Sequence, residues 1–239
     1  WHRLGFSFPL DNTPSLAMGT AEASLKEVAA AYAAFANGGF VVEPYYIRTV
    51  KTVSGEEIYT AASAGERKRI ITERSCLLMN AMLQKAVREG TGITVKTVYG
   101  VDIPLAGKTG TSQDYSDAWF AAFNPGIVIV TRVGASSRAV HFNNGSLGSG
   151  SALALPLVAL TLKKAQQDPV LRKQLYSEFP VLPPELSGML DCPDFKEKNL
   201  FDKIIDIFEN KEKTYPGRER EIENRIRNFV RRIFKKKQQ

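Results

Sequence analysis

Cysteine, histidine and long apolar runs are all scarce in this sequence of 239 residues. The two cysteines, Cys76 and Cys192, are too few and too far apart for a disulfide framework or a zinc site. Cys76 lies in an apolar run, so we expect a buried, unreactive thiol. His2 and His141 are the only histidines, which argues against a Ser-His-Asp triad or a histidine metal site.

No apolar run is long enough to cross a membrane. The longest covers residues 152–162 and contains Pro156, whereas a bilayer-spanning helix needs about 20 apolar residues. The first residues show no charged-then-apolar signal pattern. We therefore expect the sequence to start within a longer protein, with any targeting signal or membrane anchor upstream.

The positive charge is concentrated at the C-terminus. The chain carries a net charge of +7, and residues 218–239 hold nine Lys/Arg against three Glu, which leaves +1 for the preceding 217 residues. The body therefore needs no acidic partner to explain its charge.

Residues 1–165 follow an α+β pattern. Ser24 and Glu27 form a capping box before a helical apolar spacing that stops at residues 37–39. A further helix is predicted over about 73–89, and a largely apolar one over 151–167. Strands are predicted over 44–53, 57–60, 105–112, 117–123 and 127–133. Short links between the last three predict an antiparallel sheet with helices packed on it.

Residues 166–239 differ in character and are predicted to form a separate extension. Prolines predict irregular chain over 182–195. A short helix is predicted over 200–208. A stripe of apolar residues at helical spacing then follows among Arg and Lys: Ile222, Ile226, Phe229, Val230, Ile233 and Phe234. One interpretation is a charged amphipathic helix that packs its apolar stripe on the body. Another is a helix that binds an anionic membrane surface. A nucleic-acid arm is a third interpretation, but no interleaving of aromatic and basic residues supports it, and we expect no nucleic-acid partner.

The most informative segment is 106–112, Ala-Gly-Lys-Thr-Gly-Thr-Ser. A phosphate-binding P-loop would need a glycine at position 102, which is Asp, and a helix beginning where Gly110 stands. The alternative is an edge strand bordering a cleft. In a strand the side chains alternate, so Lys108 and Gly110 would share one face.

Five separated blocks place this strand in a wider context. They are residues 14–39, 89–92, 107–112, 117–120 and 147–156. In this order they resemble the transpeptidase domain of class A penicillin-binding proteins, the bifunctional peptidoglycan synthases. The resemblance covers roughly residues 1–165. A β-lactamase shares the Lys-Thr-Gly strand, but the block at 14–39 favours the synthase.

The resemblance implies a serine-type D-Ala-D-Ala transpeptidase of peptidoglycan synthesis. Lys108 and Thr111 would be catalytic, the latter through its backbone N–H in an oxyanion hole. Lys108, Thr109, Gly110 and Thr111 would bind the substrate, with the hydroxyls on its carboxylate. The implied partners are peptidoglycan stem peptides and β-lactams, the implied location is the extracytoplasmic side of the bacterial cell envelope, and no metal or organic cofactor is implied.

The sequence also departs from this family. No serine is followed by Lys three positions on, and no Ser-x-Asn occurs. Both motifs lie N-terminal to the matching region in the family, so we expect the C-terminal half of the domain, inactive without the missing N-terminal half. One face of the sheet would then be uncovered. The alternative is a non-catalytic envelope binding or scaffold module with the same fold.

Overall fold

The computed structural model describes residues 1–10, 13–61 and 68–190, which fall within the unit Trp1–Asp191. Cys192, the expected short helix over 200–208 and the expected basic helix at the C-terminus therefore lie outside the described residues.

The described chain combines helices with antiparallel strands. Its α-helices are α1 (Leu25–Ala36), α2 (Glu73–Arg88), α3 (Thr94–Thr97), α4 (Gly145–Gly148), α5 (Ala154–Ala165), α6 (Pro169–Leu175) and α7 (Pro184–Ser187). Short 3-10 turns are η1 (His2–Leu4), η2 (Pro14–Met18) and η3 (Gly188–Leu190). The strands are β1 (Thr49–Lys51), β2 (Glu57–Thr60), β3 (Ala106–Thr111), β4 (Asp117–Asn124) and β5 (Ile127–Gly134). The α+β prediction is confirmed.

The two long N-terminal helices begin at side-chain caps. The predicted capping box of α1 is present, with the Ser24 hydroxyl accepting from the Glu27 amide and the Glu27 carboxylate accepting from the Ser24 amide. Thr72 caps α2 by accepting from the Ser75 amide. Each cap satisfies amide groups that the first helical turn leaves unpaired.

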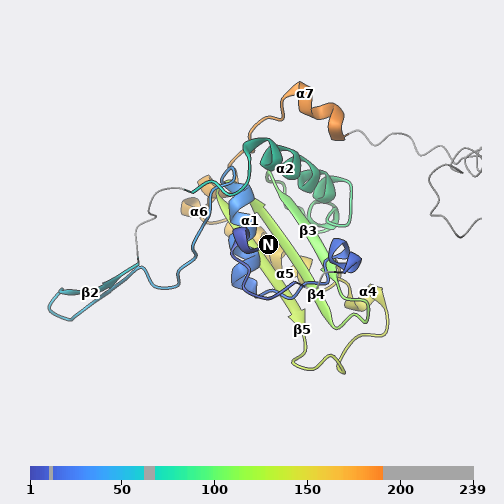
Figure 1. Ribbon diagram of the computed structural model, residues 1–239, viewed down its shortest axis with the longest axis horizontal. Helices are drawn as coiled ribbons and strands as arrows, with labels where there is room; N and C mark the ends of the chain where they lie inside the picture. The colour runs from blue at the N-terminus through green and yellow to red at the C-terminus, as the bar shows by residue number, and fades with distance from the viewer. Residues whose placement is uncertain (11–12, 62–67, 191–239) are drawn as a thin grey trace, which may run out of the picture. The chain divides into compact units, whose positions relative to one another are not determined.

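A sheet in the order β3-β4-β5 forms the centre of the described residues, and helices lie on both of its faces (Figure 1). The alternation of side chains along β4 separates these faces. Phe120 and Ala122 point toward the core that α5 helps to build, where both are essentially inaccessible to solvent. That core also holds Leu155, Val158, Ala159 and Leu162 of α5.

The opposite face of the sheet is partly covered, so the expectation of a bare face is wrong at one end. The ring of Tyr32 from α1 packs edge-on against Phe123, with ring centroids 5.6 Å apart. Phe179 packs on the same ring at 5.8 Å. Trp119, four residues earlier on this face, stays partly exposed. Covering only one end leaves the end nearer Gly110 accessible.

Asn124 ties the turn between β4 and β5 to a helix far along the chain. Its Oδ1 accepts from the amides of Gly126 and Ile127, at 2.9 and 3.1 Å. Its Nδ2 donates to the Leu175 carbonyl at 2.7 Å. Leu175, at the end of α6, is fully buried in the core with α5. The packing therefore continues beyond residue 165.

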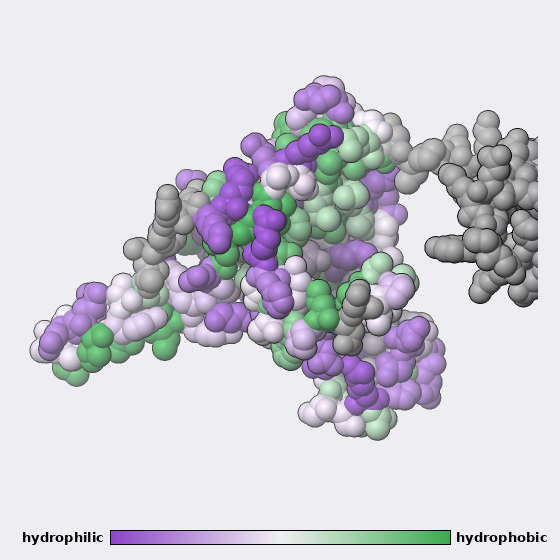
Figure 2. Space-filling view, viewed as in Figure 1, coloured by the Kyte–Doolittle hydropathy of each residue, from purple (hydrophilic) through white to green (hydrophobic). Residues whose placement is uncertain are grey.

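The hairpin β1–β2 extends away from this sheet (Figure 1). The strand expected over 44–53 is paired only over Thr49–Lys51, because an isolated two-stranded ribbon has little buried surface to hold more chain extended. All residues of both strands are exposed. Hydrophobic residues show on the surface of this hairpin (Figure 2). Ile58 of β2 is 66% exposed, and Tyr46, which precedes β1, is 88% exposed.

Candidate functional site

The strand β3 places the Lys-Thr-Gly residues at a sheet edge. Within the described residues β3 pairs with β4 alone. Lys108 lies opposite Ala121, and Gly110 lies opposite Trp119. Since directly paired residues and those two apart share a face, Lys108 and Gly110 lie on the face that also carries Trp119. The predicted sharing of one face is confirmed.

The phosphate-loop interpretation is wrong for this segment. β3 continues in register with β4 through Thr111 and Ala118. The chain then turns back within residues 112–116 into β4. A P-loop needs a helix N-terminus immediately after its Gly-Lys-Thr to hold the phosphate, and here the strand pairing occupies that position.

The backbone N–H of Thr111 points away from the sheet. The Ser112 amide donates to the Asp117 carbonyl at 3.0 Å, so residues 112 and 117 form a hydrogen-bonded pair. Such pairs alternate with non-hydrogen-bonded pairs along an antiparallel ladder. Thr111 and Ala118 are therefore a non-hydrogen-bonded pair, and the Thr111 N–H is directed to the edge, where an approaching oxyanion could accept from it.

The Lys108 side chain is exposed. Its Nζ donates to the carbonyl oxygen of Thr109 at 2.8 Å. The ammonium thus lies against the backbone of its own strand, at Thr109. An exposed, flexible lysine can swing from such a backbone contact to a bound anion, because the neutral carbonyl competes weakly with a charge.

The hydroxyls of Thr109 and Thr111 lie on the other face of β3, each with a partner. The Thr111 Oγ1 accepts from the Gly150 amide at 2.9 Å. The Thr109 Oγ1 lies 2.7 Å from the Oγ1 of Thr91. A hydroxyl has one proton to donate and can also accept, so Thr111 keeps its proton for a further acceptor, and Thr109 does so when Thr91 is the donor.

Thr91 is a residue at the site that the sequence analysis did not single out. It lies in the turn that follows α2, between Gly90 and Gly92. The only available signal was that block 89–92 belongs to the family pattern. Nothing in the local sequence places its hydroxyl beside β3, 18 positions further along the chain.

Glycine is required at position 150 by close approach of two backbones. A Cβ there would lie 2.4 Å from the Trp119 carbonyl oxygen and 2.5 Å from the Gly110 carbonyl oxygen. The segment after α4 therefore lies directly on the ladder between β3 and β4. This contact places the Gly150 amide on the Thr111 hydroxyl.

The loop from β3 to β4 is held by a carboxylate. The Asp114 Oδ1 accepts from the Ser116 hydroxyl at 2.8 Å and from the Ser116 amide at 3.3 Å. Hydrogen bonds from the Ser116 and Ser112 side chains lower the pKa of Asp114 from 3.8 to about 2. Tyr115 has a φ of 56° and approaches Gly145 and Gly148. The loop at the end of β3 is thus ordered by local bonds.

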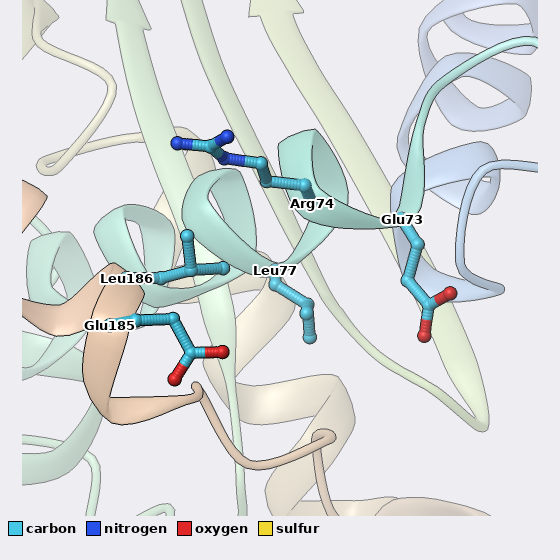
Figure 3. Close-up of a pocket in the computed structure, with 5 residues that line it drawn as sticks. All are labelled: Glu73, Arg74, Leu77, Glu185 and Leu186. Carbon is cyan, nitrogen blue, oxygen red and sulfur yellow. The ribbon is translucent and has the colours of Figure 1, made fainter.

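A pocket of about 500 Å³ lies elsewhere, between α2 and α7 (Figure 3). It is lined by Glu73, Arg74, Leu77, Glu185 and Leu186. The first three are in the first two turns of α2, whereas Val87 near its other end packs beside Gly107. At a rise of 1.5 Å per residue, Leu77 and Val87 are about 15 Å apart. The pocket therefore does not use the Lys-Thr-Gly residues.

Two further findings concern the described residues as a whole. No helix among them is both long and apolar enough to span a membrane. In the same part of the chain, no three or more His, Cys, Asp or Glu side chains gather as metal ligands would.

Comparison with known proteins identifies what this arrangement resembles. Residues 9–139 match the family described as the penicillin binding protein transpeptidase domain. Penicillin-binding protein 1A of Neisseria meningitidis serogroup A is 33% identical over 159 residues, which cover 65% of this chain and 19% of that protein. The chain thus spans about a fifth of the length of this relative.

Solved structures show the same fold. Penicillin-binding protein 1A from Haemophilus influenzae matches with a TM-score of 0.62 and 22% identity over 77% of this chain and 31% of that one. The PonA1 protein from Mycobacterium tuberculosis, in complex with penicillin V, matches with a TM-score of 0.58 and 19% identity over 76% of this chain and 50% of that one.

Proposed function

Because the chain belongs to the family of penicillin-binding protein transpeptidase domains, we propose that it supplies the Lys-Thr-Gly strand of a peptidoglycan D-Ala-D-Ala transpeptidase. The observation that carries this proposal is the family match over 9–139, which contains a Lys-Thr-Gly segment at a sheet edge. The proposed enzyme acts on the extracytoplasmic side of a bacterial cell envelope, and its ligands are peptidoglycan stem peptides and β-lactams.

The reaction needs a serine that this sequence does not carry in the family's Ser-x-x-Lys form. The serine oxygen attacks the carbonyl carbon of the penultimate D-Ala, the bond to the terminal D-Ala nitrogen breaks, and the serine proton ends on that leaving amine. An amine of a neighbouring strand then attacks the ester carbonyl carbon, the bond from that carbon to the serine oxygen breaks, and a proton of the attacking amine returns to the serine oxygen. With a β-lactam the reaction stops after the first step, at the acyl-enzyme. The chain alone is inactive in this scheme.

The residues of β3 have separate roles in this scheme. The Thr111 N–H, directed to the sheet edge, donates to the oxyanion. The Thr109 and Thr111 hydroxyls donate to the substrate carboxylate. Lys108 attracts the same anion and assists proton transfer at the serine. Gly110 leaves room beside the strand for the acyl peptide to lie against the backbone.

Electrostatics explain why a covering segment matters. Two unit charges 4 Å apart interact by about 1 kcal/mol in bulk water and by about 4 kcal/mol at an effective dielectric near 20. Lys108 of this chain is exposed, so its interaction with an anion is close to the bulk-water value. A segment that carries the serine and packs over Trp119 and the β3 edge would exclude water. The interaction energy at the site would then rise toward the value at the lower dielectric.

Labelling with a fluorescent penicillin tests the site. The full-length protein that contains this sequence is compared with its Lys108→Ala variant, and Lys164→Ala serves as the control because Lys164 is exposed on α5. We expect Lys108→Ala to slow labelling by on the order of 100-fold, the range for losing a group that assists proton transfer, and Lys164→Ala to match the wild type. Equal labelling of Lys108→Ala and wild type would show the site assignment to be wrong.

The second candidate is a non-catalytic envelope binding or scaffold module. Its support is the absence of Ser-x-x-Lys and Ser-x-Asn from the sequence. The coding sequence upstream of Trp1 separates the two. An in-frame Ser-x-x-Lys followed by Ser-x-Asn supports the enzyme, and a start codon directly upstream supports the module.

A further inference from the structure

Thr91 lies against the proposed carboxylate-binding residues without belonging to the Lys-Thr-Gly motif. Its Oγ1 is 2.7 Å from the Oγ1 of Thr109, and either oxygen can be the donor. The Thr91 side chain is exposed and Thr109 is half-buried. A ligand at the β3 edge would therefore meet a pair of bonded hydroxyls beside the Thr111 hydroxyl.

The chain holds Thr91 in place through backbone contacts with the end of α2. The Gly92 amide donates to the Ala86 carbonyl at 3.1 Å. A Cβ on Gly90 would lie 2.8 Å from that same carbonyl oxygen, and a Cβ on Gly92 would lie 3.0 Å from the Val87 Cα. The turn can lie this close only because both neighbours of Thr91 are glycines.

The same helix is fixed to β3, so the turn and the strand keep one relative position. Val87 is buried in the core. Its Cγ2 lies 3.3 Å from where a Cβ on Gly107 would be, so the helix packs directly on the strand. The contact between Thr91 and Thr109 is thereby a consequence of how α2 packs on β3.

Proton counting then suggests a role. Each hydroxyl has one proton and two lone pairs. When Thr91 donates to the Thr109 oxygen, the single proton of Thr109 is directed to another acceptor. We propose that Thr91 is a positioning residue that orients the Thr109 hydroxyl toward the substrate carboxylate, an inference that rests on the proposed function.

A purely structural role explains the contact less well. Both hydroxyls are accessible to water, which competes for their hydrogen bonds, so the pair adds little to the stability of the fold. A bond from Thr109 to an anion is charge-assisted and gains from a second donor behind it. The contribution of Thr91 should therefore depend on the negative charge of the ligand.

The test compares Thr91→Val, which keeps the shape and loses the hydroxyl, with Thr91→Ser, which keeps the hydroxyl. Thr161→Val is the control, because Thr161 is exposed on α5 with its hydroxyl bonded to Leu157 of the same helix. In the full-length protein, the second-order rate constant of acylation is measured with a fluorescent penicillin and with its carboxylate methyl ester.

We expect Thr91→Val to lower the rate constant for the free acid by roughly tenfold, as for the loss of a hydrogen bond serving a charged group. The rate constant for the ester should change by less than about twofold, since no carboxylate is left to orient. Thr91→Ser should restore the free-acid value, and Thr161→Val should leave both unchanged.

Three outcomes overturn the inference. One is an unchanged free-acid rate in Thr91→Val while Lys108→Ala still slows labelling, and this leaves the proposed function standing. Another is an equal loss for acid and ester, which indicates structural damage. The last is a wild-type protein that no penicillin labels, in which case the proposed function fails as well.

Discussion

At the scale of single residues, Gly39 meets two independent constraints. Its φ of +102° is unfavourable for residues with a side chain. A Cβ there would also lie 2.1 Å from the Ile71 carbonyl oxygen and 3.3 Å from the Cys76 Sγ. Cys76 is 2% exposed, as expected for a buried thiol, and burial raises its pKa. The glycine thus lets the chain after α1 pass directly over the start of α2.

We expect Gly39→Ala to lower the free energy of unfolding by about 3 kcal/mol, because strain and overlap add. Gly38 is the matched control. It has a φ of +82°, but open space surrounds its Cβ position, so Gly38→Ala should cost about 1 kcal/mol. Urea unfolding of both variants checks this, and equal losses would show that the contact with Ile71 contributes nothing.

At the site, some features follow from the local sequence and others depend on segments far along the chain. The face shared by Lys108 and Gly110 was predictable, since it follows from strand alternation. The hydroxyl partners of Thr109 and Thr111 were not. Thr91 and Gly150 reach them from other segments, 18 and 39 positions away. Alternation says on which face a side chain lies but not which neighbour lies there.

At the scale of elements, the N-terminal segment is attached to α1 by one carboxylate. Glu27 completes the predicted capping box with Ser24, and it also accepts from the amide and hydroxyl of Ser7, at 2.7 and 2.6 Å. The hydrogen bonds from Ser7, and then those from Ser24, lower the pKa of Glu27 from 4.5 to about 2. The two bonds from Ser7 join residues 20 positions apart, so they form only in the folded chain.

The lowered pKa predicts acid release of this segment. Because the folded-state pKa lies below the ordinary value, the carboxylate stabilises the contact fully above about pH 4.5, and this is lost as the pH falls through about 2. The side-chain carboxyl carbon of Glu27 should titrate near pH 2 by NMR, with the Ser7 amide shift following. Glu27→Gln should abolish that amide titration, and a midpoint near 4.5 would contradict the contact.

Several elements differ from expectation, among them α7 and η3, which form where irregular chain was expected over 182–195. Two others differ for opposite reasons. The strand expected over 44–53 is shorter because its hairpin lacks a sheet to bury it. The helix α6 was not expected, since the prolines and charges after residue 167 obscure it. It forms from Asp168, whose carboxylate caps its first amides, and is held by buried Leu175. Tertiary burial decided both cases.

At the scale of the whole molecule, the charge distribution predicts a membrane-surface interaction. The region from Arg218 carries +6, whereas residues 1–217 carry +1. Clusters of basic residues bind anionic lipid surfaces, and salt screens the attraction. This tail lies outside the described residues, so the prediction stands on the sequence alone.

We expect the intact chain to co-sediment with anionic vesicles at low salt, and the chain truncated before Arg218 to bind clearly less. Raising the ionic strength from about 0.01 M to about 1 M shortens the screening length from about 30 Å to about 3 Å, so binding should be lost. Neutral vesicles provide the control. Equal co-sedimentation of intact and truncated chains at low salt would remove the membrane interpretation.

The sequence by itself determined the α+β class, the capped helix α1, the turn after β4 and the edge strand with its Lys-Thr-Gly order. These follow from periodicity and from hydrogen bonds within a few residues, which the chain encodes locally. Only the tertiary structure decided that Thr91 meets Thr109 and that Asn124 meets Leu175, 51 positions away. Such contacts depend on how α2 and α6 pack on the sheet, because packing brings together groups that have no local preference for one another.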